Sequence, residues 1–283
     1  MDEDLTHAES HFAFGKNWAA YARKITLREI EEAERGLAKL LGDRLDGHRL
    51  LDIGCGSGLH ALAALRLGAR EVVAIDIDAD SVATTRAVLA QWWAGSNWRA
   101  EERSVFDLAP ETMGGPFDIV YSWGVLHHTG DLHRALAAAA KMVAQDGRFA
   151  FALYRRIWMD WFWRIEKRWY ARASPAVQGR ARAVYRVLFK LGLFVTGRRF
   201  EEYVANYRSN RGMHFEHDAH DWLGGWPYES ILPHEVEAVM QPLGFRPERI
   251  FARKGRILGR DSGFLGSGCD EYVYRRVTSA CAA

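Results

Sequence analysis

A glycine-rich turn between an apolar strand and a helix constrains this chain more than any other feature. Residues 50–58 read LLDIGCGSG, and an apolar run over 72–75 follows and ends at Asp76. Glycines in the turn permit positive φ and let a ligand lie against the backbone, because no Cβ is in the way. The helix expected after Gly58 offers unpaired N–H groups to that ligand. An acid at the end of the second strand can accept both hydroxyls of a ribose. These elements predict the nucleoside-binding half of a doubly wound sheet.

The spacing of the glycines narrows the choice of ligand. The dinucleotide fingerprint G-x-G-x-x-G requires its last glycine at the position of Leu59. This chain instead reads D-x-G-x-G-x-G, with Asp52 two residues ahead of the first glycine. The Asp52 carboxylate would repel a pyrophosphate and suits a cationic ligand, such as an ammonium or a sulfonium.

The motif from Asp52 to Gly58, with Asp76 downstream, resembles the first motif of the class I S-adenosylmethionine (SAM)-dependent methyltransferases. The layout is most similar to the methyltransferase-11-like and ubiquinone-type branches, over residues 35–153 and 233–278. The resemblance implies SAM as the cofactor, with Ile77 packed on the adenine. It also implies that Asp107 accepts from the adenine amine, although Asp107 could instead cap a helix or a turn. The residues that we expect to contact the cofactor are Asp52, Gly54, Cys55, Gly56, Gly58, Asp76, Ile77, Val105, Asp107, Ser122, Trp18 and Tyr21.

Strands and helices alternate along the first half of the chain, which favours a parallel sheet covered on both faces. Helices are expected over 27–41, 60–67, 80–92, 132–143 and 234–242, and strands over 49–53, 71–75, 98–104, 117–122 and 148–153. Two later strands, 246–252 and 271–277, are expected to form an antiparallel pair. The predicted fold is therefore α/β: a doubly wound, mostly parallel, seven-stranded Rossmann-like sheet with a helical insertion after strand five.

Four segments follow from this pattern. Residues 1–34 form an N-terminal lid and helix, with the aromatic leader 11–23 as the lid. Residues 35–153 form the cofactor-binding core, residues 154–232 a helical insertion that caps the substrate, and residues 233–283 the last part of the core sheet. Fourteen Lys and Arg stand against four acids between residues 154 and 211. Tryptophans and arginines interleave there, which fits a helix packed on the sheet, or an anionic amphiphile or membrane surface.

The segment after strand four supplies the first candidates for a catalytic base. It contains His127 and His128, whose adjacent side chains cannot both point into one pocket. We favour His128 for the pocket, while a structural role for both remains open. An imidazole titrates near neutral pH and can accept a proton from a hydroxyl group.

A second polar cluster contains His214, His217 and His220, with acids between them. It could form a polar wall of the acceptor pocket, a solvated loop or a metal site. Their spacing of three residues spreads around a helix, so we predict no bound metal. The loop 222–229 is aromatic and broken by glycines, which suits a pocket rim or a hydrophobic plug. Its Glu229 is a further candidate base.

Bulk properties set the remaining expectations. Hydrophobic content of 48%, charged content of 26% and a formal charge of +2 are ordinary for a soluble protein and give no general case for nucleic acid. Three cysteines make no even disulfide framework, and the acidic amino end has no apolar core typical of a signal peptide. The apolar run 183–195 is too short to span a bilayer. We therefore expect a soluble, cytoplasmic protein.

Together these features predict O-methylation of a small-molecule acceptor with a histidine as general base, and an anionic or amphiphilic acceptor is one option. An alternative is methylation of a polyprenyl-linked or glycan acceptor at a membrane surface. A tRNA-modifying relative and a non-catalytic SAM-binding protein are further alternatives. The methyl acceptor, the methylated atom and the oligomeric state stay open.

Overall fold

The computed structural model describes residues 12, 14–195, 197–205, 215–252, 256–257, 260–261 and 268–277. For residues 216–218, 256–257 and 260–261 it describes the backbone alone.

A seven-stranded sheet forms the centre of the protein, in the order β3-β2-β1-β4-β5-β9-β6. The strands are β1 (Arg49–Ile53), β2 (Glu71–Asp76), β3 (Trp98–Glu102), β4 (Phe117–Trp123), β5 (Val143–Tyr154), β6 (Phe245–Phe251) and β9 (Cys269–Arg276). Strands β1 to β5 pair in parallel, and β9 is antiparallel to both of its neighbours, β5 and β6. The predicted mostly parallel, doubly wound sheet with a final antiparallel pair is confirmed. Its strand order reverses between β1 and β4, where such sheets bind ligands.

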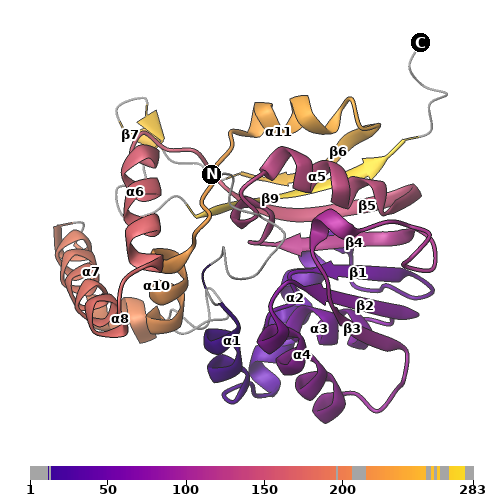
Figure 1. Cartoon of the computed structure of the whole chain (residues 1–283), viewed down its shortest axis with the longest axis horizontal. Helices are drawn as coiled ribbons and strands as arrows, with labels where there is room; N and C mark the ends of the chain where they lie inside the picture. The colour runs from indigo at the N-terminus through magenta and orange to yellow at the C-terminus, as the bar shows by residue number, and fades with distance from the viewer. Residues whose placement is uncertain are drawn as a thin grey trace.

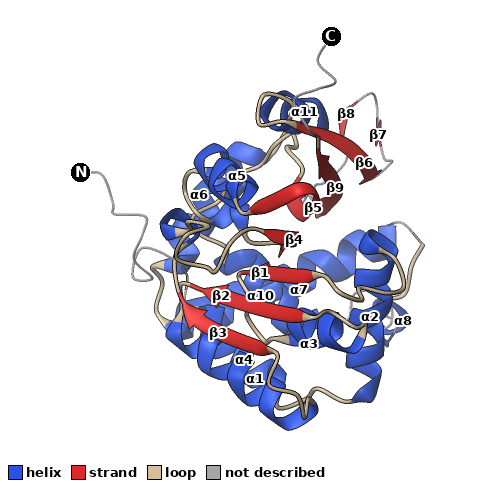
Figure 2. Ribbon diagram, turned by 90° about the vertical axis from the view of Figure 1, so that its right-hand side faces the viewer, coloured by secondary structure: helices blue, strands red, loops and turns tan. Residues whose placement is uncertain are grey.

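Helices cover both faces of this sheet (Figures 1 and 2). Helices α2 (Leu27–Leu41), α3 (Leu59–Arg66) and α4 (Ala79–Trp92) pack on one face, and α5 (Leu132–Lys141) and α11 (Pro233–Met240) on the other. Successive residues of β1 alternate between the two cores, with Leu50 in one and Leu51 in the other. This period-two alternation is what a strand buried on both faces requires.

The fifth strand begins at Val143 rather than at Arg148, so its expected start was wrong. Gly147 lies inside the strand, at an irregularity where the register against β4 shifts between Phe117 and Ile119. A Cβ on Gly147 would come within 2.9 Å of the carbonyl oxygen of Asp118. The glycine therefore marks an irregularity within a strand, not the beginning of one.

Among the described residues, four helices lie between β5 and α11 and extend to one side of the sheet, at the left of Figure 1. They are α6 (Asp160–Ala171), α7 (Pro175–Val195), α8 (Phe200–Ala205) and α10 (Phe215–Gly224). Trp163 and Tyr170 of α6 pack with Leu223 and Tyr228 in an apolar cluster of their own. Two short strands, β7 (Arg256–Ile257) and β8 (Arg260–Asp261), form a separate antiparallel pair that the sequence analysis missed.

The N-terminal helix α1 (Phe14–Ala22) lies between the core and the insertion, beside α4 and α10 (Figure 1). The Gly15 N–H donates to Asp78 at the start of α4, at 2.9 Å. Asn17 Nδ2 donates to Asp221 Oδ1 of α10, at 2.7 Å. These two hydrogen bonds fix the aromatic leader against both parts of the protein.

Replacing Gly15 with alanine should loosen α1. A Cβ there would stand 2.6 Å from the Asp78 carboxylate, which also accepts from the Asp80 N–H at 2.8 Å. The carboxylate would have to move and weaken one of these bonds. We expect trypsin to cut the α1 segment several-fold faster in Gly15→Ala than in the unmodified protein.

The matched control is Gly36→Ala in α2, where an added Cβ meets nothing within 4 Å. That change should raise the free energy of unfolding by about 0.5–1 kcal/mol, because glycine is costly inside a helix. It should leave cleavage of α1 unchanged. Equal cleavage of all three proteins would show that the Gly15 contact does not hold α1.

Candidate functional site

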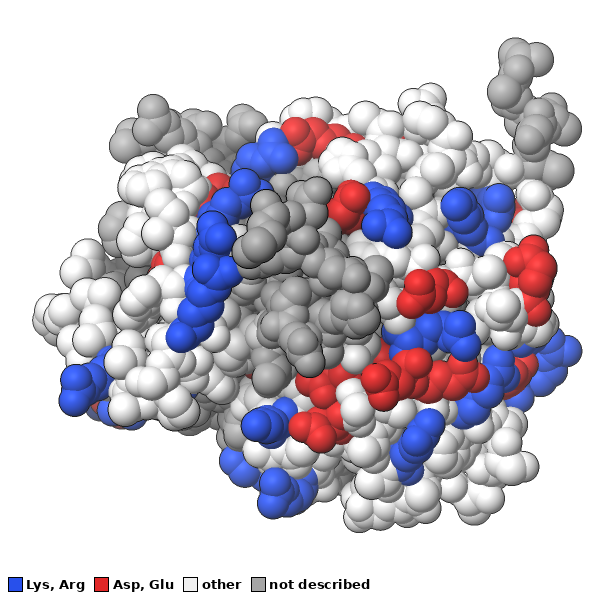
Figure 3. Space-filling view, viewed as in Figure 1, with Lys and Arg blue, Asp and Glu red and all other residues white. Residues whose placement is uncertain are grey.

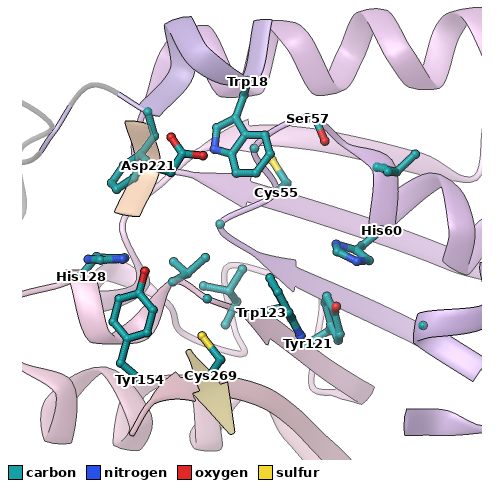
Figure 4. Close-up of a pocket in the computed structure, with 18 of the residues that line it drawn as sticks. Trp18, Cys55, Ser57, His60, Tyr121, Trp123, His128, Tyr154, Asp221 and Cys269 are labelled. Carbon is teal, nitrogen blue, oxygen red and sulfur yellow. The ribbon is translucent and has the colours of Figure 1, made fainter. Parts of the chain in front are cut away.

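A cavity of about 1250 Å³ opens at the carboxyl ends of the central strands (Figure 4). The glycine turn and the ends of β2 and β4 line it from the core side. Helix α1 and the insertion line it from the other side. In Figure 4, Trp18 and Cys55 lie at one side of the cavity, and His128, Tyr154 and Cys269 lie opposite them. The cavity thus lies where the strand order predicts a ligand site.

Two glycines of the turn hold conformations and close contacts that a side chain would not allow. Gly54 and Gly56 have φ of 77° and 51°, in the left-handed region that favours glycine. A Cβ on Gly54 would stand 2.3 Å from the Val125 side chain. The N–H groups of Gly54 and Cys55 both donate to the carbonyl of Ile75, at 2.8 and 3.0 Å, which ties the turn to β2.

The carboxylate of Asp76 lies at the end of β2 and lines the cavity. It accepts the N–H of Gly56 at 3.0 Å on one oxygen and the N–H of Asp78 at 3.0 Å on the other. Burial raises the pKa of Asp76 to about 6, although these hydrogen bonds act in the opposite direction. Each oxygen keeps a second lone pair, so the carboxylate can still accept from two hydroxyl groups.

Asp52 lies outside the described lining of the cavity. It stands in β1 beside Tyr121 of β4 and close to Cys55, which both belong to the cavity wall. Its side chain is buried, and its Oδ2 has no hydrogen-bond partner among the described residues. Burial, together with a smaller effect of the charge of Asp76, raises the pKa of Asp52 to about 7. A cation close to these two acids would favour their ionised forms.

The predicted cofactor residues divide into two groups. Those that line the cavity are Trp18, Tyr21, Gly54, Cys55, Gly56, Asp76, Ile77 and Val105. Four others lie outside the described lining: Asp52, Gly58, Asp107 and Ser122. Gly58 begins α3 against Thr85, and the Ser122 hydroxyl donates to the carbonyl of Ile53 at 3.1 Å. Asp107 is exposed on a short 3-10 helix, Val105–Asp107, and points to no described part of the cavity.

On the side facing the insertion, His128 lines the cavity together with Tyr154 and Trp222. The His128 Nδ1 lies 2.7 Å from the carbonyl oxygen of Pro227. Because a carbonyl can only accept, Nδ1 carries the proton and the lone pair of the neutral ring is on Nε2. The same loop passes close to the ring, since a Cβ on Gly225 would stand 2.6 Å from its Cε1 atom.

The neighbouring candidates, His127 and Glu229, lie outside the described lining of the cavity. His127 is fully buried under Tyr154, whose N–H donates to its Nδ1 at 3.3 Å. Burial, with smaller effects of His128 and Lys167, lowers the pKa of His127 well below its usual value. Glu229 accepts from the Leu132 N–H at 2.8 Å and so caps α5. Neither residue is part of the described lining, so the geometry supports His128 over both.

The second histidine cluster is only partly described. His214 lies outside the described residues, and so does the side chain of His217. His220 Nδ1 lies 2.8 Å from the Tyr170 hydroxyl and 3.0 Å from an Arg182 nitrogen, which indicates a structural role. Within the described residues no three His, Cys, Asp or Glu side chains come together as a metal site.

Several residues of the cavity wall were not found by sequence reasoning. His60 of α3 packs against Tyr121 and Trp123 of β4, with ring centroids 5.2 and 6.2 Å apart. Burial lowers the pKa of His60 to about 4, so its ring is neutral at pH 7. Trp123 donates to Glu271 of β9 at 3.2 Å. His60 follows the glycine turn directly and could have been suspected, whereas Glu271 depends on the pairing of β9 with β5.

Comparison with known proteins decides the family. The sequence model of a family described as a methyltransferase domain matches residues 21–229, which is more than half of the chain. The chain belongs to the class I SAM-dependent methyltransferases. Its cofactor is SAM.

Solved structures agree in fold. A SAM-dependent methyltransferase from Mesorhizobium loti has a TM-score of 0.51 and 18% identity, covering 86% of this chain and 98% of that one. The magnesium protoporphyrin IX methyltransferase from Synechocystis PCC 6803, with bound S-adenosylhomocysteine, has a TM-score of 0.50 and 14% identity, covering 87% and 82%. At these identities the likeness shows the fold alone.

Curated relatives match over shorter stretches. A ubiquinone biosynthesis O-methyltransferase of Bartonella tribocorum is 32% identical over 116 residues, covering 41% of this chain and 45% of the relative. A ribosomal protein L11 methyltransferase of Methylobacillus flagellatus is 35% identical over 129 residues, covering 44% and 39%. The matched stretch thus spans less than half the length of these relatives.

The residues of the cavity fit this cofactor. SAM carries a sulfonium and an ammonium, and the buried Asp52, whose Oδ2 has no partner in the described part of the chain, lies two residues before the glycine turn. We infer that Asp76 would accept hydrogen bonds from the ribose hydroxyls of SAM. Asp52 would attract the positively charged methionine part of SAM. Trp18 covers the turn from α1, since a Cβ on Gly56 would stand 3.1 Å from its indole.

Replacing Asp76 with alanine should weaken SAM binding by roughly 2–4 kcal/mol, because two charge-assisted hydrogen bonds to the ribose would be lost. Isothermal titration calorimetry measures the change. The control is Asp80→Ala, an exposed acid in the first turn of α4, which should bind SAM normally. Unchanged affinity in a folded Asp76→Ala protein would remove this residue from the cofactor site.

SAM affinity should also rise with pH. The pKa values of Asp52 and Asp76, about 7 and about 6, lie above the ordinary carboxyl value, so both groups carry protons at pH 5. A bound cation favours the ionised forms, so binding at low pH releases protons. For each proton that binding releases, the dissociation constant should fall by up to about tenfold per pH unit between pH 5 and 7, and it should then level off.

Calorimetry in buffers of different ionisation enthalpy counts the released protons. In Asp52→Asn the change in SAM affinity near pH 7 should disappear, while the change caused by Asp76 should remain. A dissociation constant that does not change between pH 5 and 8 would contradict the predicted coupling.

Proposed function

We propose that this methyltransferase methylates an oxygen atom of a small, planar acceptor, with His128 as the general base. The hydrogen bond between His128 Nδ1 and the Pro227 carbonyl carries the proposal. It fixes the tautomer that has a lone pair on Nε2, which is the form that a base requires.

Aromatic side chains around His128 support a planar acceptor. The His128 ring lies 5.4 Å from Tyr154 and 5.4 Å from Phe14, measured between centroids. Trp222 meets Tyr154 edge to face at 5.2 Å. Such rings bind a flat apolar ligand by stacking and edge contacts, and a few polar groups fix its orientation.

The proposed chemistry needs little from the protein beyond alignment and one proton transfer. When bound, the cofactor supplies an electrophilic methyl group on a positively charged sulfur. The aromatic wall would hold the acceptor oxygen in line with that group, and α1 would exclude water from above. His128 Nε2 would take the hydroxyl proton as the oxygen bonds to the methyl carbon. The Pro227 carbonyl would then stabilise the imidazolium through Nδ1–H.

The relatives and the cysteines support the rest of the proposal. The O-methyltransferase among the relatives favours oxygen as the acceptor atom, whereas the protein methyltransferase among them acts, by its name, on a ribosomal protein. Cys55 is a buried free thiol in the glycine turn, which supports a reducing compartment such as the cytoplasm.

Replacing His128 with alanine should lower turnover by about 10²–10⁴ and leave SAM affinity nearly unchanged. Turnover is measured as S-adenosylhomocysteine formation with a panel of phenols, catechols and hydroxyquinones. The control is His133→Ala, which removes an exposed histidine of α5. Full activity of His128→Ala would exclude it as the base, and a product methylated on nitrogen or carbon would overturn O-methylation.

A further inference from the structure

Exposed apolar side chains gather on two helices of the insertion. Fourteen large apolar side chains are exposed among the described residues, and eleven of them lie between residues 158 and 195. Chance scatter over the surface would not concentrate them in this way, and large apolar patches mark interaction sites. The eleven are Trp158, Trp161, Phe162, Ile165, Trp169, Val184, Val187, Leu188, Leu191, Phe194 and Val195.

On α6 these residues form one stripe. Trp161, Ile165 and Trp169 follow each other at a spacing of four and are 62%, 63% and 52% exposed. The opposite side of the helix buries Trp163 and Tyr170 in the cluster next to α10. Packing against the protein therefore explains only one of the two apolar faces of α6. Of the two interpretations of this Trp/Arg-rich segment, a helix packed on the sheet does not account for the outer stripe, whereas an anionic amphiphile or membrane surface does.

Helix α7 has the same two-sided character. Leu188 and Leu191 are 51% and 54% exposed on its outer side. Tyr185 and Phe189, on the other side, line the cavity that holds the cofactor site. One helix thus separates the cavity from the exposed apolar surface.

Positive charge accompanies the apolar stripes. Arg164, Arg168 and Arg172 recur at a spacing of four beside the outer stripe of α6. Figure 3 shows a continuous band of Lys and Arg over this part of the molecule. Between residues 154 and 205 the chain has twelve Lys and Arg and four acids. A second copy of this face would bring like charges together, whereas an anionic surface would complement them.

We propose that the outer face of α6 and α7 docks on an anionic lipid bilayer. This outer face comprises the eleven exposed apolar residues and the adjoining arginines. Tryptophans and apolar side chains enter the boundary between headgroups and acyl chains, while arginines contact lipid phosphates. Among the described residues no helix is long and apolar enough to cross a membrane, so the contact is peripheral.

Vesicle flotation tests this proposal with the full chain and needs no methyl acceptor, so its outcome is independent of the proposed reaction. We expect binding to vesicles of phosphatidylcholine with 30% phosphatidylglycerol, and much weaker binding to phosphatidylcholine alone. Salt should weaken the binding, because surface charges are screened.

Replacing Arg168 with glutamine should lower partitioning into anionic vesicles about fivefold, because each charge near the membrane contributes roughly 1 kcal/mol. The control Arg44→Gln, 80% exposed on the core, should bind normally.

The apolar part is tested by Trp161→Glu with Ile165→Glu on α6, and by Leu188→Glu with Leu191→Glu on α7. Each pair should lower vesicle binding at least tenfold. Leu27→Glu is the matched control, since Leu27 is 57% exposed at the start of α2. Circular dichroism and SAM titration check that each variant folds.

Failure of the unmodified protein to float with anionic vesicles would overturn the proposal. So would equal vesicle binding by the two double variants and the Leu27→Glu control. A dimer in light scattering that dissociates in Leu188→Glu with Leu191→Glu, without vesicle binding, would assign this face to a second copy of the chain instead.

Discussion

The site depends on two acids, Asp52 and Asp76, that the protein shields from water beside a glycine-rich turn. Asp52 and Asp76 have pKa values raised to about 7 and about 6 because the protein shields them from water. Burying two acids near each other opposes folding, and a cationic ligand offsets that cost through the same electrostatic interaction. The glycine turn and Trp18 line the cavity beside Asp76, where we propose that such a ligand binds.

The rest of the molecule closes the space above these acids. Helix α1 hydrogen-bonds to Asp78 of the core and to Asp221 of the insertion, so this one short helix connects the two parts of the protein. On the insertion side, the loop that supplies the Pro227 carbonyl holds the His128 ring. Hydrogen bonds therefore join the core, α1 and the insertion around the cavity, although these segments are distant in the sequence.

The insertion has two apolar surfaces with different consequences. Its inner surface, with Tyr185 and Phe189, forms the end of the cavity, and its outer surface exposes Leu188 and Leu191. A structural role accounts for the first surface but not for the second. Both surfaces belong to one helix, so binding at the outer face would bring a membrane within one helix diameter of the cavity wall.

The sequence by itself determined the sheet, the glycine turn and the acid at the end of β2, because these depend on local patterns of alternation and backbone freedom. The sequence also favoured His128 over His127 for the pocket and left Glu229 as a further candidate base. Only the tertiary structure places the Pro227 carbonyl, 99 residues further along the chain, against the His128 ring. The same holds for Glu271, which reaches the cavity through the pairing of β9 with β5. Contacts between distant segments leave no periodic trace in the sequence, whereas strands, helices and tight turns do.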